Sequence, residues 1–160
     1  MLTSITRIVV QLVRWTVIAV FSIMITVTFA QVVSRYVFLS PLPWSEELAR
    51  YCFVWIVFLG ATLGLERGVH IGVDILTTLL PSSVQRWLAR INDVLILAFT
   101  LIIITASLPV LDANRLQSSP ALGIQMAQVY LAIPLGMAIM ALLVFGKLAE
   151  GFRQSSQKGA

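Results

Sequence analysis

The sequence predicts an all-α integral membrane protein with four transmembrane helices. Of its 160 residues, 59% are hydrophobic and only 11% are charged, which is unlike a soluble globular domain. Hydrocarbon strongly disfavours charged side chains, so long stretches without Asp, Glu, Lys, Arg or His are typical of membrane spans. The chain contains four of them: Trp15–Ser34, Tyr51–Leu65, Val94–Leu111 and Leu116–Gly146. We therefore expect one membrane domain over residues 1–160, with little material outside the bilayer.

The first two spans are predicted at about residues 13–36 and 44–65. About 20 helical residues cross a 30 Å hydrocarbon core, and the first uncharged stretch reaches that length alone. The second is too short, so its helix should begin near Trp44, after Pro41 and Pro43 have fixed the chain.

Acidic and basic side chains occupy the expected first turns of the second span. Acidic groups suit the N-terminal end of the helix dipole, and Glu46 and Arg50, four residues apart, can pair on one face. Two interpretations remain open here, namely simple capping and solvation, or a docking surface for a protein on the non-cytoplasmic side. The candidate docking residues are Arg35, Trp44, Ser45, Glu46, Glu47 and Arg50.

A short helix in the membrane interface is predicted at about residues 71–80, between spans two and three. Apolar positions within it fall on one helical face, and Pro81 then breaks the helix. His70 and Asp74 are four residues apart, which could suggest a metal or proton-transfer pair. The chain has a single histidine, so we favour a structural, hydrogen-bonded motif at the cytoplasmic interface.

The last two spans are predicted at about residues 88–111 and 126–146. Ser82 and Gln85 match a capping box that would start the helix leading into the third span. Pro134 should kink the fourth span.

Small residues mark candidate helix-packing positions in the second and fourth spans. The spacing of Gly60 and Gly64 lets another helix approach closely, and that helix could belong to this chain or to a partner. The full set of candidate packing residues is Gly60, Gly64, Pro134 and Gly136.

The Lys and Arg residues predict the orientation of the chain. Eight of them fall in the two termini and the loop between spans two and three, against three in the other two loops. This imbalance predicts that both termini are cytoplasmic. The basic residues are dispersed singly, which argues against nucleic-acid binding.

The spans carry no residue pattern for catalysis or for a cofactor. No Ser-His-Asp arrangement, phosphate-cradling loop or pair of buried carboxylates appears, and one histidine cannot supply a bis-histidine haem site. Ion-coupled carriers usually keep an ionisable group at mid-membrane depth, and these spans have none. The sequence thus indicates a non-enzymatic membrane protein that supports transport or assembly without carrying the ion path.

Four passages have the order and spacing of motifs in one transporter family: Gln31–Phe38, Pro43–Tyr51, Gly68–Asp74 and Val129–Gly136. Together with the four spans, they resemble the small, Q-type membrane subunit of tripartite ATP-independent periplasmic (TRAP) transporters over about residues 8–150. The third passage departs from the family pattern at Val69 and Gly72, where Glu and Arg are common, while His70 and Asp74 match it.

The resemblance implies a complex in the bacterial inner membrane. A large membrane subunit would carry substrate and sodium, and a periplasmic substrate-binding protein would deliver an organic acid of the carboxylate or sialic-acid type. The small subunit would pack against the static scaffold of the large one, so that a mobile domain can move like an elevator. Membrane lipids would be further partners, and no cofactor is implied. The alternatives are the small subunit of a tripartite tricarboxylate transporter and a membrane anchor of another complex.

Overall fold

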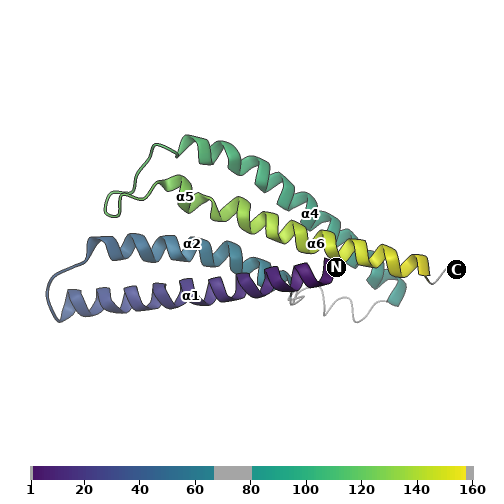
Figure 1. Ribbon diagram of the computed structural model, residues 1–160, viewed down its shortest axis with the longest axis horizontal. Helices are drawn as coiled ribbons and strands as arrows, with labels where there is room; N and C mark the ends of the chain where they lie inside the picture. The colour runs from purple at the N-terminus through teal and green to yellow at the C-terminus, as the bar shows by residue number, and fades with distance from the viewer. Residues whose placement is uncertain (1, 67–80, 158–160) are drawn as a thin grey trace.

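The computed structural model describes residues 2–66 and 81–157, and in that part of the chain every regular element of more than one residue is a helix (Figure 1). The elements are α1 (Leu2–Tyr36), α2 (Pro43–Glu66), α4 (Ser82–Ala113), α5 (Met126–Tyr130) and α6 (Ala132–Gln157). The interfacial helix expected at 71–80 lies outside the described residues, as do His70 and Asp74.

Within residues 2–66 and 81–157, four helical segments are long and apolar enough to cross a membrane, which confirms the predicted all-α, four-span class. They are Thr6–Tyr36, Pro43–Glu66, Trp87–Ala113 and Met126–Ala149. Each exceeds the length that a 30 Å core needs, so the helices must tilt in the bilayer or extend beyond its hydrocarbon.

The spans form two antiparallel hairpins that lie side by side (Figure 1). The helix α2 packs against α1 on one side and α6 on the other, and α4 packs against α6. The order across the molecule is therefore α1, α2, α6, α4. At the end where the chain begins, α1 also reaches α6, because Thr6 lies beside Gly146.

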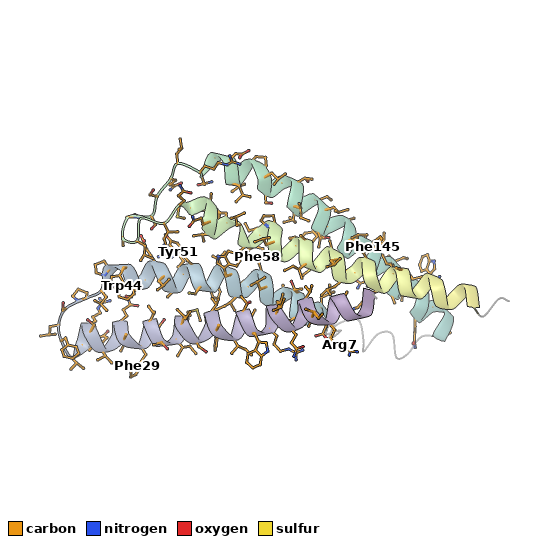
Figure 2. All side chains as sticks on the ribbon, in the orientation of Figure 1. Arg7, Phe29, Trp44, Tyr51, Phe58 and Phe145 are labelled. Carbon is orange, nitrogen blue, oxygen red and sulfur yellow. The ribbon has the colours of Figure 1, made fainter. Side chains whose placement is uncertain are left out.

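A small apolar core lies where α2, α4 and α6 meet. Its buried members are Leu65, Met137, Met140 and Val144. By contrast, no residue in the most apolar 18-residue stretch of α1 is buried. Phe29 on this helix extends away from the bundle (Figure 2). Lipid tails are as apolar as these side chains, so a membrane protein gains little by hiding them from lipid.

The fourth span is interrupted near its start, at Leu131 between α5 and α6. Pro134 has no N–H to donate to the carbonyl of Tyr130, and its ring crowds that same group. The backbone hydrogen bonds of the helix continue on both sides of the break. Leu131 N–H donates to the Ala127 carbonyl at 3.0 Å, and Leu135 N–H donates to the Leu131 carbonyl at 3.2 Å. The break therefore has the physical cause that the sequence indicates.

The start of α4 differs from the predicted capping box. The N-cap residue is Pro81 rather than Ser82, and the proline side chain makes no capping hydrogen bond. Instead, the Pro81 carbonyl accepts from the backbone N–H groups of Val84 at 2.9 Å and Gln85 at 3.1 Å. The capping prediction was wrong by one residue, because Pro81 already supplies an extended residue before the first turn.

Candidate functional site

The buried hydroxyl groups of the described spans bond to backbone carbonyls. Thr62 Oγ1 lies 3.3 Å from the Phe58 carbonyl and 3.4 Å from the Gly136 carbonyl. Thr100 donates to the Leu97 carbonyl at 2.8 Å in the same way. Among the described residues, no group of three or more His, Cys, Asp or Glu could hold a metal ion. These hydroxyls therefore serve helix geometry and packing.

The two hairpins come into close contact at Gly136. A Cβ atom built on this glycine would lie 2.9 Å from both the Cβ atom and the carbonyl oxygen of Phe58. Phe58 lies on α2 toward α6 (Figure 2). Only a residue without a side chain fits this approach, so Gly136 sets how near α2 and α6 come.

The other two glycines singled out from the sequence have a different environment. A Cβ atom built on Gly60 or on Gly64 would meet nothing within 4 Å. Neither glycine is therefore at a close helix–helix approach within the described part of this chain, although both are only partly exposed.

Glu47 joins the start of α2 to the segment between α4 and α5. Its carboxylate accepts from the backbone N–H of Ala121 at 3.2 and 3.3 Å and from that of Leu122 at 3.2 Å. The segment closes on itself through Ser119 N–H to the Ile124 carbonyl at 2.8 Å. Its turn includes Gly123 with φ +67°, a conformation that glycine adopts without strain. Glu47 thus fastens one hairpin to the other at this end.

The neighbouring acid, Glu46, contacts the other side of α2. It accepts from Gln31 Nε2 of α1 at 2.9 Å and is exposed. The expected pairing of Glu46 with Arg50 is absent from the described structure. Arg50 and Arg35 are both exposed at this end.

The remaining two candidate docking residues have opposite surroundings. Ser45 is fully buried, and its hydroxyl donates to the Leu42 carbonyl at 2.6 Å. Trp44 is exposed at the turn between α1 and α2 (Figure 2). Four of the six candidates are therefore on the surface, namely Arg35, Trp44, Glu46 and Arg50.

Two contacts at the opposite end of the molecule were not foreseen from the sequence. Lys147 Nζ of α6 donates to the Leu65 carbonyl at the end of α2, at 3.4 Å. Arg14 of α1 lies 3.9 Å from the Glu66 carboxylate. The sequence signal for both was only that charges gather at span borders, which does not say which helices meet.

These features define a multi-pass membrane protein. In its described spans, the buried hydroxyl groups bond to backbone carbonyls, and the charged side chains lie at the ends of the spans. The family of tripartite ATP-independent periplasmic transporters, DctQ component, matches residues 24–154. The chain belongs to this family, which confirms the resemblance drawn from its motifs.

Relatives of known description agree. A TRAP transporter small permease protein of Haemophilus influenzae is 32% identical over 128 residues, covering 79% of this chain and 80% of the relative. The sialic acid TRAP transporter permease protein SiaT of Haemophilus influenzae is 43% identical over 70 residues, covering 44% of this chain and 11% of SiaT. The isethionate TRAP transporter permease protein DctMQ of Oleidesulfovibrio alaskensis is 31% identical over 112 residues, covering 69% of this chain and 18% of DctMQ.

The low coverage of SiaT and DctMQ means that both proteins are much longer than this chain. Small permeases of this family work with a large membrane subunit. The chain is thus a membrane subunit of a transporter, from a family of subunits that are generally non-catalytic.

Proposed function

We propose that this chain is the non-catalytic scaffold of a TRAP transporter. It holds the large membrane subunit during sodium-driven, binding-protein-dependent uptake of an organic acid. The observation that carries the proposal is that its spans combine a charge-free interior with a large uncovered apolar surface. A carrier that conducted ions by itself would need polar or ionisable groups along a path through the membrane.

The arrangement of the helices suits a scaffold. Four spans in the order α1, α2, α6, α4 bury few side chains between them and leave broad apolar faces for other helices or lipid. The open glycine face of α2, at Gly60 and Gly64, lets a helix of the large subunit approach the backbone closely. We assign this face to the contact between the two membrane subunits.

The charged end of α2 is proposed as the contact for the periplasmic substrate-binding protein. Its surface consists of Arg35, Trp44, Glu46 and Arg50, which are exposed. Exposed charges at the rim of an interface steer association and set its rate. Ser45 and Glu47 support this surface from behind, because one is buried and the other holds the segment at Ala121.

The proposed setting is the bacterial inner membrane with both termini in the cytoplasm. The excess of Lys and Arg at the termini and in the loop after α2 supports that orientation. It places the turn of the α1–α2 hairpin and the segment between α4 and α5 on the periplasmic side. Substrates of the carboxylate or sialic-acid type agree with the sialic acid in the description of SiaT.

Co-purification tests the proposed partnership. The tagged chain is expressed together with a large TRAP membrane subunit from the same organism and isolated in mild detergent. We expect the two to elute as one complex, and the G60L/G64L variant to elute largely alone. Elution of the unaltered chain without the large subunit would contradict the scaffold function.

A further inference from the structure

A cleft of about 430 Å³ opens at the end of the molecule where α1 begins and α2 ends. Its rim carries three basic side chains, Arg7, Arg14 and Lys147, and one carboxylate, Glu66. Arg7 lies near the start of α1 in Figure 2. The cleft is therefore cationic overall, although one acid lies within it.

Among the described residues, the contacts made by the rim use only part of its hydrogen-bonding capacity. Arg14 and Glu66 are 3.9 Å apart, and their side chains are 46% and 39% exposed. Lys147 makes a long bond of 3.4 Å to the Leu65 carbonyl. A guanidinium offers five N–H donors and an ammonium three, so both groups can bind a further anion.

The floor of the cleft is apolar. Val10, Leu65 and Leu143 line it, and each is buried. Gly146 is also part of the lining, and a Cβ atom there would lie 3.6 Å from Thr6 Cγ2. A large side chain at this glycine would therefore take up space that the cleft now offers. A site with cations at its rim and an apolar floor fits an amphipathic anion better than an inorganic one.

The cleft lies at the border of the membrane spans. The charge-free stretch of α1 begins at Trp15, directly after Arg14, and Trp15 is exposed like the tryptophans that gather at membrane–water interfaces. Beyond it, Ile18 and Phe21 present exposed apolar surface toward the middle of the span. At the end of a charge-free stretch the phosphate groups of phospholipids are expected, with their acyl chains beside the apolar surface further along the span.

We propose that this cleft binds the phosphate of an anionic phospholipid. Arg7, Arg14 and Lys147 hold the phosphodiester, and the acyl chains lie along the exposed face of α1. Basic pockets between transmembrane helices are a known means of selecting anionic headgroups. The proposal concerns the chain itself and holds whether or not the scaffold function does.

Native mass spectrometry of the purified full-length chain in detergent tests the proposal, with phosphatidylglycerol, phosphatidylcholine and inorganic phosphate added separately. We expect one phosphatidylglycerol to be retained in preference to phosphatidylcholine. Each cation near an anionic headgroup is worth about five-fold in affinity, so R14Q/K147Q should bind roughly 25-fold more weakly. E66Q should bind phosphatidylglycerol more tightly, because it removes a like charge from the rim. R115Q, at the other end of the bundle, should behave as the unaltered chain.

Several outcomes would overturn the proposal. Equal retention of phosphatidylcholine, or normal retention by R14Q/K147Q, would show that the cations do not select the headgroup. Inorganic phosphate that competes at the same concentration as the lipid would identify a free-anion site. Cross-linking of the cleft to an acidic segment of another protein in native membranes, with no lipid retained, would identify a protein contact. The E66Q result keeps the test decisive should R14Q/K147Q fail to fold.

Discussion

Gly136 lies so close to Phe58 that a Cβ atom on the glycine would be 2.9 Å from the Phe58 carbonyl oxygen. One turn further along α2, Thr62 Oγ1 is 3.4 Å from the Gly136 carbonyl. The two hairpins are thus joined where a glycine, a phenylalanine backbone and a buried hydroxyl meet. This seam fixes the relative position of α2 and α6, and with it the faces that the molecule offers to its surroundings.

Substituting Gly136 by alanine should separate the hairpins. The backbone oxygen of Phe58 cannot rotate away as a side chain would, so the helices must move apart. Forcing extra methyl groups into a packed site typically costs about 1–3 kcal/mol. Reversible unfolding in mixed micelles, followed by circular dichroism, should show this loss. G64A is the matched control, because nothing lies within 4 Å of its new methyl group. Equal stability of the two variants would contradict the close seam.

The open glycine face of α2 should matter for assembly and not for the fold of this chain. In G60L/G64L, each added Cβ atom has no described atom within 4 Å, so the new side chains can enter without a clash at the helix backbone. We expect unfolding of the isolated chain to be unchanged within about 0.5 kcal/mol, which is typical of surface substitutions. The yield of complex with the large subunit should fall at least several-fold. A normal yield would assign the subunit contact to another face.

Glu47 should hold the segment between α4 and α5 in place. The variant E47A removes the acceptor of two backbone N–H groups, at Ala121 and Leu122. A charged hydrogen bond of this kind is worth about 1 kcal/mol or more, so amide exchange there should accelerate at least about five-fold. Hydrogen–deuterium exchange by mass spectrometry measures this directly. E46A is the control, because its partner is Gln31. Unchanged amide exchange in E47A would show that the Glu47 carboxylate does not hold the segment between α4 and α5 in place.

Charge reversal at Glu46 should weaken delivery by the binding protein. This carboxylate is exposed and is separate from the Glu47 contact, so E46K alters the surface without releasing the neighbouring segment. We expect a several-fold higher binding-protein concentration at half-maximal uptake, an effect that rises as salt is lowered. Assembly of the membrane subunits should be normal. D112K, near the same end on α4, is the control. If uptake depends on binding-protein concentration in the same way for E46K and for the unaltered complex, Glu46 is not part of the docking surface.

The spans could be predicted from the sequence because the membrane imposes a simple rule on composition. Charges are excluded from hydrocarbon, so the uncharged stretches between Arg14 and Lys147 already mark four crossings. The interruption before Pro134 was likewise predictable, since proline removes a particular backbone bond. Both signals depend on the chain's own covalent chemistry and not on its neighbours.

The roles of individual residues at helix contacts could not be predicted in the same way. Gly60, Gly64 and Gly136 are equally small, yet among these three only Gly136 lies at a close approach to another described residue of the chain. Glu46 and Glu47 are adjacent acids, but successive residues of a helix point in different directions. Glu46 therefore contacts α1, whereas Glu47 contacts Ala121. Such differences arise from the order of helices across the molecule, which the pattern of charges does not encode.

Uptake in proteoliposomes tests the central claim most directly. Vesicles containing this chain alone, the large subunit alone, or both are given binding protein, labelled organic acid and an inward sodium gradient. The scaffold function predicts uptake only by vesicles that contain both membrane subunits. Uptake by this chain alone, or full uptake by the large subunit without it, would contradict the account.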